Sequence, residues 1–460
     1  MGRRSVGYEV LRTYVRFAFW LTHRRIVVIG LTNIPPFKPI IFAANHQNAL
    51  MDPLALACTN THQTLWLTRA DIFKNKTIRA VLKFMKMIPI YRIRDGKDNL
   101  INNQSTFNQV TRVLEQKESI ALFPEAAHSG RRQMLPHKKA IPRIALDAED
   151  KNGFNLDLKI IPVGIYYDHY WKFNRTLLVQ YGEAIEVDLY KEQFEENAQN
   201  AMLSLRDAIH DRLEPLTLQI NSDKYYQDFE NIRMVTGEEY AKKSLISKNS
   251  VLELFYSDRA LIKTLEELET ANPDVFQLIR GKTEAYVNLL HKEQFDHRIV
   301  VKTEMNSFFS LLFKLTGVLI SSPLLLFGVL FNFIPYYLSH KILTRKIKDP
   351  AFLSTFTFVA GLILYPFFYF LESYLVLALS GSWLITLIVL VLMPLSGKLA
   401  YNLLKSGLDL WMVLRFKTDR RKLFQYLKNQ KTEIMKIIED HSINGFPAGY
   451  VSEYNSCDSK

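Results

Sequence analysis

A histidine and an aspartate lie six positions apart in the stretch from Asn45 to Pro53, directly after an apolar run. The imidazole of His46 accepts a proton near neutral pH without prior tuning. The carboxylate of Asp52 could hold the other ring nitrogen and stabilise the imidazolium that forms. Since no serine or cysteine nucleophile is obvious nearby, the pair predicts a general base that takes its proton from a hydroxyl group of the substrate.

Two further motifs begin roughly 75 residues after His46. They are Phe123-Pro124-Glu125-Ala126-Ala127-His128-Ser129 and Leu135-Pro136-His137-Lys138-Lys139-Ala140. Together with Asn45, His46 and Asp52, these motifs resemble the glycerophospholipid acyltransferase family, which includes glycerol-3-phosphate and lysophosphatidate acyltransferases. Two more blocks of that family correspond to residues 88–92 and 160–163, and the resemblance covers roughly residues 25–215.

The spacing between the histidine and the aspartate departs from the family pattern. Five residues separate His46 from Asp52, where the family usually has four. An extra residue in a helix would rotate Asp52 by about 100°. We therefore expect the intervening loop to bulge and a helix to begin at Asp52-Pro53, because Asp caps helices well and Pro fits the first helical position. A subset with this spacing includes fungal acyltransferases that use glycerol 3-phosphate or dihydroxyacetone phosphate.

Three other residues differ from the family motifs. Ala126 and Ala140 replace glycines, and His128 replaces the arginine that follows the FPEG sequence of the family. The loss of that arginine removes the phosphate contact that the resemblance implies for this loop. Arg131 or Arg132, just beyond, could substitute for it.

The resemblance implies a reaction and a set of substrate contacts. His46 would remove the proton from a glycerol-type hydroxyl, which attacks an acyl thioester and forms a tetrahedral oxyanion. The implied donor is acyl-CoA or acyl-carrier protein, with no bound cofactor, and the acceptor carries a phosphate. Arginine binds phosphate with a fork of donors and lysine as a point charge. The residues expected to bind substrate are Asn45, Arg92, Glu125, Ser129, Arg131, Lys138 and Lys139.

Some of these residues have a structural alternative. Asp52 could act only as a helix cap. Glu125 could pair with Arg131 or brace the basic cluster, and Arg94 is an alternative to Arg92. The histidines outside the motifs lack metal-ligand spacing, and the only two cysteines lie too far apart for a CxxC site, so we predict no metal.

Alternating strands and helices must position these motifs. Short apolar runs predict strands at residues 25–30, 39–44, 64–68, 88–91, 119–123 and 159–166. Helical patterns lie between them, from residue 52 onward and at residues 72–87, 100–116 and 142–149. This alternation predicts an α/β domain, a mixed sheet flanked by helices. The candidate residues follow strand ends, where open α/β sheets bind ligands.

Charge and hydropathy together indicate a membrane. The net charge is +12, which predicts an anionic partner, either nucleic acid or a lipid surface. Uncharged runs occupy residues 315–339, 351–371 and 373–397, and each is long enough to cross a hydrocarbon core of about 30 Å. Because no groove-reading motif accompanies the basic residues, we expect a phospholipid membrane and no nucleic acid as partner.

The chain divides into five expected segments. These are an amphipathic interfacial helix at 1–24, an acyltransferase domain at 25–220, a charged helical extension at 221–305, a membrane region at 306–398, and a basic helical tail with a disordered end at 399–460. The first helix could instead pack on the protein's own core. Further helices are predicted at residues 192–213, 250–270, 273–292 and 409–440.

The distribution of lysine and arginine predicts the topology. The loop at 341–348 and the segment after Gly397 are basic, which places both on the cytoplasmic side. Residues 351–397 would then form a hairpin that turns near Ser380-Gly381. Residues 308–339 would form C-terminal re-entrant helices that turn at 321–323, or else a single tilted transmembrane span. We expect an integral membrane protein with its active site on the cytoplasmic face.

Three hypotheses about function follow. The first is a membrane-bound O-acyltransferase that transfers a fatty acyl group from a thioester donor to glycerol 3-phosphate or dihydroxyacetone phosphate in phospholipid synthesis. The second takes lysophosphatidate as the acceptor. The third is a non-catalytic lipid-binding membrane protein on an acyltransferase fold. The changes at Ala126 and His128 favour the third hypothesis, whereas the intact His46 and Asp52 oppose it.

Overall fold

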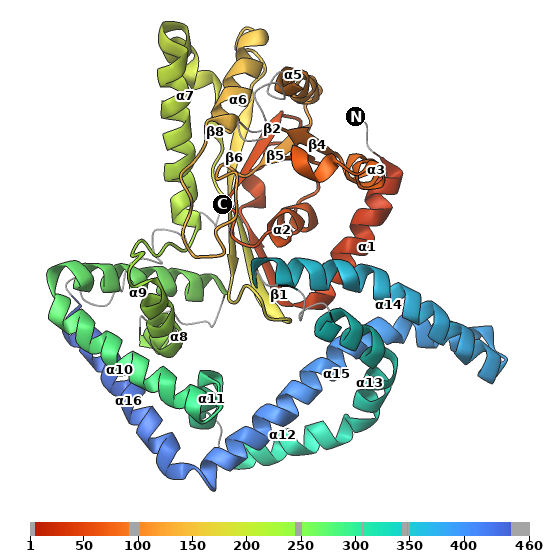
Figure 1. Ribbon diagram of the computed structural model, residues 1–460, viewed down its shortest axis with the longest axis vertical. Coiled ribbons are helices and arrows are strands. Elements are labelled where there is room, and N and C mark those ends of the chain that lie inside the picture. The colour runs from red at the N-terminus through yellow and green to blue at the C-terminus, as the bar shows by residue number, and fades with distance from the viewer. Residues whose placement is uncertain are drawn as a thin grey trace. The chain divides into compact units, whose positions relative to one another are not determined.

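The computed structural model describes residues 5–91, 102–243, 251–305, 308–342, 347 and 350–442. The chain folds into two compact units. The first contains Met1–Leu218 together with Ile347–Phe358, and the second contains Gln219–Lys346 together with Val359–Lys460. Figure 1 labels their helices and strands.

The first unit is built on a mixed sheet. Its strands are β1 (His23–Ile29), β2 (Ile40–Ala44), β3 (Leu65–Arg69), β4 (Met87–Ile90), β5 (Ser119–Leu122), β6 (Lys159–Tyr167), β7 (Arg175–Tyr181) and β8 (Ile185–Glu186). The order is β1-β7-β6-β2-β5-β3-β4, with β8 beside β6. Only the pairs that β6 forms with β7 and β8 are antiparallel among the described ladders. All six predicted strands are confirmed, whereas β7 and β8 were not predicted.

Helices cover both faces of this sheet. In the first unit they are α1 (Val6–Thr22), α2 (Met51–Thr59), α3 (Lys76–Phe84), α5 (Asn102–Glu115), α6 (Ala140–Lys151) and α7 (Lys191–Leu213). The predicted helix at 72–87 is shorter, because a 3-10 turn (Ala70–Phe73) precedes α3 and the chain is already extended at Met87. A mixed sheet flanked by helices is therefore the observed architecture.

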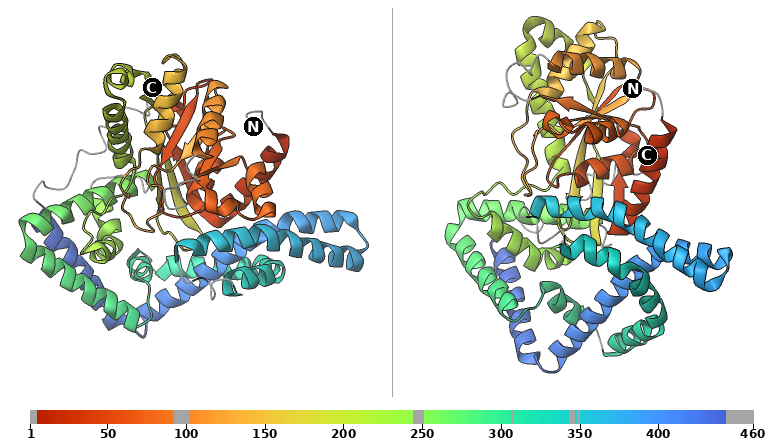
Figure 2. Two further views of the ribbon diagram at one scale, coloured as in Figure 1. Left: turned by 45° about the horizontal axis from the view of Figure 1, so that its top comes forward. Right: turned by 45° about the vertical axis from the view of Figure 1, so that its right-hand side comes forward.

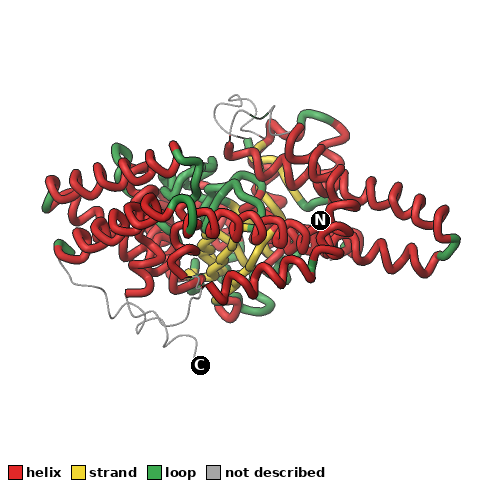
Figure 3. The backbone as a smooth tube through the Cα atoms, turned by 90° about the horizontal axis from the view of Figure 1, so that it is seen from below, coloured by secondary structure: helices red, strands yellow, loops and turns green. Residues whose placement is uncertain are grey.

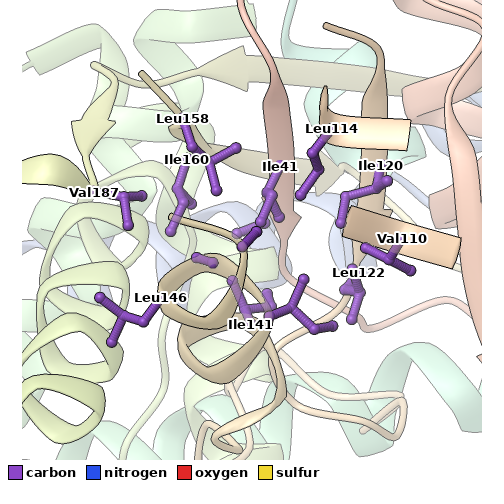
Figure 4. Close-up of a cluster of buried hydrophobic side chains, with 14 of the residues drawn as sticks. Ile41, Val110, Leu114, Ile120, Leu122, Ile141, Leu146, Leu158, Ile160 and Val187 are labelled. Atoms are coloured by element: carbon purple, nitrogen blue, oxygen red, sulfur yellow. The ribbon is translucent and has the colours of Figure 1, made fainter. Parts of the chain in front are cut away.

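The main core lies between the sheet and helices α5, α6 and α7. Every residue of β2 is buried, as expected for a strand with parallel neighbours on both sides and helices on both faces. Ile41 of β2 points into the cluster shown in Figure 4, together with Leu114 of α5 and Ile141 of α6. Each fully buried side chain of this size contributes about 1.5–3 kcal/mol to folding. This cluster fixes β2 and so the chain that follows it.

The first helix packs on its own unit through a polar face. Arg12 donates a hydrogen bond to the carbonyl oxygen of His62 (2.7 Å), and Arg16 donates one to that of Asn60 (3.0 Å). Phe19 is fully buried. Other apolar side chains of α1 are exposed, namely Val6, Val10, Phe17 and Trp20. The helix thus packs on the protein and still presents an apolar surface, so its interfacial role stays a prediction.

The described residues of the second unit form helices and connecting loops and contain no strand. Figure 3 shows helices in red, strands in yellow and loops in green. The helices of the second unit are α8 (Tyr226–Lys243), α9 (Val251–Ala271), α10 (Pro273–Lys292), α11 (His297–Met305), α12 (Phe308–Ile320), α13 (Ser322–Tyr337), α14 (Pro350–Ser380, from Val359 on), α15 (Trp383–Lys417) and α16 (Arg421–Asp440). Helices α8 and α11 were not predicted. The predicted helix at 409–440 is wrong as a single helix, because the chain breaks at Thr418 between α15 and α16.

The charged extension and the basic tail form one body. Helix α16 packs against α8 and α10. Lys431 of α16 is buried, with its ammonium 3.2 Å from the carboxylate of Glu239 and 2.6 Å from that of Glu304. A buried lysine requires such pairing, because an isolated buried charge is strongly destabilising.

Three described helices are long and apolar enough to cross a membrane. They are Ser322–His340, Phe352–Ser380 and Trp383–Lys417. The predicted hairpin turn is confirmed, since α14 ends at Ser380, Gly381 has a φ of +61° and α15 begins at Trp383. A helix break at Ser321 is also present. Whether residues 308–339 are re-entrant or a single span stays a prediction.

Helices α13 and α15 lie side by side (Figure 2). Small residues allow this close contact. A Cβ atom on Gly328 would lie 2.4 Å from the carbonyl oxygen of Ser396. Asn332 of α13 donates a hydrogen bond to the carbonyl oxygen of Met393 (3.1 Å) and accepts one from the hydroxyl of Tyr369 (2.6 Å). Small residues and interhelical hydrogen bonds of this kind hold helices together in membranes.

Candidate active site

The predicted contact between His46 and Asp52 is present. Strand β2 ends at Ala44, and His46 is the second residue beyond it. Its Nδ1 atom lies 3.0 Å from Oδ2 of Asp52. The Asp52 side chain is 1% exposed and that of His46 is 16% exposed. The carboxylate is therefore shielded from water, while the imidazole remains accessible to a substrate.

A bulged loop accommodates the extra residue. Ala49 has a φ of +41°, which lies in the left-handed region. The backbone N–H groups of Gln47 and Asn48 both donate to Oδ2 of Asp52, at 2.8 and 2.7 Å. The loop thus folds around the carboxylate and brings it back to His46.

The predicted helix start is wrong by two residues, because the sequence predicts Asp52 as the cap and Pro53 as the first helical residue. Helix α2 begins at Met51, and Leu50 holds the position before it. Asp52 is consequently inside the first turn and does not cap the helix. Its side chain instead reaches back to the loop, and its negative charge near the helix N-terminus is favourable.

A tyrosine and an arginine that were not predicted lie behind Asp52. Tyr167 of β6 is fully buried, and burial together with the charge of Asp52 holds its pKa well above the usual range. The guanidinium of Arg175 lies 4.9 Å from the centre of the Tyr167 ring. Burial lowers the pKa of Arg175, and the nearby Tyr167 and Asp52 oppose this shift. Only the short apolar run at 177–179 could have revealed β7, which carries Arg175.

Glu125 joins two loops of the site. Its Oε1 accepts a hydrogen bond from the backbone N–H of His46 (2.7 Å), and its Oε2 accepts one from that of Leu135 (2.8 Å). Burial raises the pKa of Glu125 to about 8, although both backbone bonds act in the opposite direction. Because both oxygens are engaged with the backbone, the carboxyl group acts as a brace between the motifs around His46 and Leu135.

Aromatic rings enclose the imidazole of His46. The ring of Phe123 stacks on it with centroids 4.1 Å apart, and His128 meets it edge-on at 5.7 Å. With a proton on Nδ1 donated to Asp52, Nε2 carries the lone pair that can accept a proton. Within the described ranges, no group of three His, Cys, Asp or Glu side chains could hold a metal ion. The arrangement therefore supports proton transfer at His46.

Comparison with known proteins identifies the domain. Residues 25–166 match the family described as Acyltransferase. This part of the chain is an acyltransferase domain. Its motifs resemble those of glycerophospholipid acyltransferases, and similar proteins carry the names of glycerol-phosphate acyltransferases.

Two relatives are named as acyltransferases of glycerol phosphates. The chain is 22% identical over 377 residues to glycerol-3-phosphate O-acyltransferase 1 of Saccharomyces cerevisiae, an alignment that covers 75% of this chain and 48% of that protein. It is 22% identical to 1-acyl-sn-glycerol-3-phosphate acyltransferase of Borreliella burgdorferi, over 46% of this chain and 81% of that protein. The chain spans about half the length of the first curated relatives it matches.

One solved structure is also similar to part of this chain. It is the 1-acyl-sn-glycerophosphate (LPA) acyltransferase of Thermotoga maritima, at 18% identity and a TM-score of 0.33. The match covers 45% of this chain and 78% of that one.

The amide of Asn45 is engaged within the acyltransferase domain. Its Nδ2 donates to the carbonyl oxygen of Ile165 (3.1 Å), and its Oδ1 accepts from the N–H of the same residue (2.7 Å). These bonds continue the pairing of β2 with β6 beyond the end of the strand. We therefore propose that Asn45 positions His46, rather than binding substrate as the sequence predicts.

The basic residues of the acyltransferase domain differ in exposure. Arg131, Lys138 and Lys139 are exposed. Arg132 is buried, with its guanidinium 5.1 Å from the ring centres of both Tyr166 and Tyr170. Of the two replacements considered for the missing arginine, Arg131 alone is exposed. The predicted phosphate ligand Arg92 and its alternative Arg94 lie outside the described residues.

Ser129 shapes the loop that carries Arg131. Its Oγ donates to the carbonyl oxygen of Arg131 (2.9 Å) and accepts from the N–H of the same residue (3.2 Å). The backbone N–H of Lys138 donates to the carbonyl oxygen of Pro124 (2.8 Å). The two motif loops of the acyltransferase domain are thus held together by their backbones, with the basic side chains on their surface.

The replacement of a family glycine by Ala126 creates local strain. Ala126 has a φ of +57°, which is unfavourable for any residue with a Cβ atom. We expect Ala126→Gly to raise the free energy of unfolding of the acyltransferase domain by about 1 kcal/mol. Thermal unfolding measures this change, with Ala127→Gly as the control, because Ala127 is not among the residues with positive φ. A lower stability of Ala126→Gly than of wild type would contradict the prediction.

Proposed function

We propose that the protein transfers a fatty acyl group from a thioester donor to a hydroxyl group of glycerol 3-phosphate or dihydroxyacetone phosphate, as a step of phospholipid synthesis. The observation that carries this proposal is the His46–Asp52 pair, with its 3.0 Å contact, at a strand end of an acyltransferase domain. The names of the two relatives from Saccharomyces cerevisiae support glycerol 3-phosphate as the acceptor.

The reaction requires one proton to move twice. Nε2 of His46 takes the proton from the acceptor hydroxyl while its oxygen attacks the thioester carbonyl. The imidazolium that forms is stabilised by the carboxylate of Asp52. The tetrahedral intermediate then collapses, the C–S bond breaks, and the leaving thiolate takes the proton back from His46. Transfer is direct, so no acyl-enzyme is formed.

The phosphate of the acceptor needs cationic partners. Arg131, Lys138 and Lys139 are exposed on the two loops that Glu125 and the backbone hold beside His46. Their charges suit a phosphate dianion. We propose these three residues, together with Arg92, as phosphate ligands.

We also propose a class of acyl donor and a location at a membrane. Acyl-CoA and acyl-carrier protein are the two thioester donors that the resemblance implies. Three apolar helices support a membrane protein. The basic segments at 341–348 and after Gly397 favour an active site on the cytoplasmic face.

A second acceptor has its own support. The alignment with the lysophosphatidate-type enzyme of Borreliella burgdorferi covers 81% of that protein, against 48% of the yeast enzyme. Lysophosphatidate also presents a free glycerol hydroxyl beside a phosphate. It is therefore the alternative acceptor for the same site.

A competition assay separates the three hypotheses. The purified full chain in lipid nanodiscs receives an isotope-labelled acyl thioester of CoA or acyl-carrier protein with equimolar glycerol 3-phosphate, dihydroxyacetone phosphate and unlabelled lysophosphatidate, and mass spectrometry identifies the labelled products. We expect lysophosphatidate or acyl-dihydroxyacetone phosphate as the main product. Phosphatidate as the main product would instead support the second acceptor. Phospholipid binding without turnover by either donor would favour a non-catalytic protein.

A further inference from the structure

The first turns of α14 belong to the same compact unit as the active site. That unit includes Ile347–Phe358, roughly 300 residues after the loop that joins His46 to Asp52. The hydroxyl of Ser354 donates to Oδ1 of Asn48 (2.9 Å), and the hydroxyl oxygen of Thr355 accepts from the backbone N–H of Leu50 (3.2 Å). Two adjacent side chains of α14 therefore bind the loop that carries the candidate base and its carboxylate.

Asn48 transmits the first of these contacts to Asp52. It is fully buried, and its backbone N–H donates to Oδ2 of Asp52 (2.7 Å). Its side-chain amide bridges two distant segments, because Oδ1 accepts from Ser354 and Nδ2 donates to the carbonyl oxygen of Tyr170 (3.2 Å). The hydrogen bonds of the Asn48 side chain to Ser354 and Tyr170 therefore help to position the Asn48 N–H group that donates to Asp52.

Thr355 supports the other half of the loop. Leu50 immediately precedes α2, where backbone N–H groups have no partner inside the helix. The hydroxyl oxygen of Thr355 accepts a hydrogen bond from the N–H group of Leu50, which lies two residues before Asp52. The loop also contains the left-handed residue Ala49, and a strained backbone of this kind persists only when its surroundings hold it in place.

Two aromatic contacts fix the same segment of α14. Phe352 meets the ring of His128 edge-on at 5.0 Å, and His128 in turn meets His46 at 5.7 Å. Phe358 packs on Phe19 of α1 at 6.0 Å. Contacts on both sides of Ser354 and Thr355 thus hold these hydroxyl groups against the loop.

We propose that Ser354 and Thr355 are positioning residues for the His46–Asp52 pair, so that the start of α14 completes the active site. This inference rests on the proposed function of that pair. The same helix continues to Ser380 and contains the candidate membrane span Phe352–Ser380. A helix long enough to cross a bilayer therefore also holds the loop of the candidate base in its working conformation.

The test removes the two hydroxyl groups and leaves the side-chain shapes nearly unchanged. Ser354→Ala and Thr355→Val, alone and combined, are assayed as purified full chains in nanodiscs with the acceptor that the competition assay identifies. We expect kcat to fall about 10-fold for each single variant and about 10²-fold for the double variant, because small displacements of reacting groups are costly. The KM for the acceptor should stay within about threefold, since the loop does not supply phosphate ligands.

Matched variants separate positioning from a general effect on the helix. Thr355→Ser keeps the hydroxyl and should retain the kcat of wild type. Thr357→Val is the control, because the Thr357 hydroxyl donates within its own helix to the carbonyl oxygen of Leu353 (2.8 Å) and should be dispensable. Melting temperatures of all variants are measured in parallel.

The outcomes distinguish this inference from the proposed function. If His46→Ala is inactive while the double variant keeps the kcat of wild type, the inference is overturned and the proposed function stands. If His46→Ala is fully active, the proposed function itself fails. If the double variant does not fold, Thr355→Val and Thr355→Ser decide, since equal kcat values for these two would also overturn the inference.

Discussion

Replacement of His46 by alanine is expected to lower kcat for acyl transfer by about 10²- to 10⁴-fold. The acceptor hydroxyl then keeps its proton while its oxygen attacks, and no other group holds a carboxylate-paired imidazole at this strand end among the described residues. Binding of both substrates should change little, because the loss concerns the transition state. Steady-state rates at saturating donor and acceptor measure the effect.

The neighbouring histidine provides the matched control for His46→Ala. His128 lies 5.7 Å from His46, has similar chemistry, and stands where the family has arginine. We expect His128→Ala to lower kcat less than about 10-fold. The His128 ring packs against His46 but does not contact Asp52. Equal losses in the two variants would argue against His46 as the base and for a general disturbance of the loop.

Asp52→Asn is expected to lower kcat by about 10²-fold, or ~2.7 kcal/mol in activation free energy. A single oxygen of Asp52 accepts from His46, Gln47 and Asn48. The carbonyl oxygen of asparagine can take that place and keep all three bonds, whereas the negative charge that stabilises the imidazolium is lost. The fall in kcat of Asp52→Asn therefore measures the contribution of the negative charge, because the hydrogen bonds that hold the loop are retained.

Two further variants interpret the result at Asp52. Asp52→Ala removes the three hydrogen bonds as well and should lower both the melting temperature and kcat, because two buried N–H groups lose their acceptor. Asp168→Asn is the control, since Oδ1 of Asp168 accepts from the N–H of Thr176 (2.8 Å) outside the site. If Asp52→Asn retained the turnover of wild type, Asp52 would be a purely structural residue.

The sequence predicted the elements that carry strong local signals. The apolar runs that become β2, β5 and β6 were identified, and with them the place where His46 leaves the sheet. The need for a bulge between His46 and Asp52 also followed from the spacing alone. The left-handed residue Ala49, which makes the bulge, carries no local signal in the sequence, because alanine rarely adopts this conformation.

Features that depend on distant partners were not predictable in the same way. Strand β7 contains the polar residues Arg175 and Gln180, and only a short apolar run lies between them. The sequence alone therefore does not predict a strand, which becomes evident only from its pairing with β1 and β6. The sequence predicts Asn45 as a substrate ligand, but it does not reveal that the Asn45 amide is hydrogen-bonded to Ile165, 120 positions away. Ser354 and Thr355 lie at the start of an apolar run, and nothing local indicates a contact with the loop before α2.

The interrupted course of the first unit has a consequence during synthesis. The first part of this unit ends at Leu218, and its second part begins at Ile347, roughly 130 residues later in the chain. At about 5–20 residues per second, the ribosome needs about 6–26 s for that interval. During this time the sheet and its helices can form, but Asn48 and Leu50 have not yet met Ser354 and Thr355. The nascent chain can therefore form the hydrogen bonds from this loop to Ser354 and Thr355 only after the start of α14 has been made.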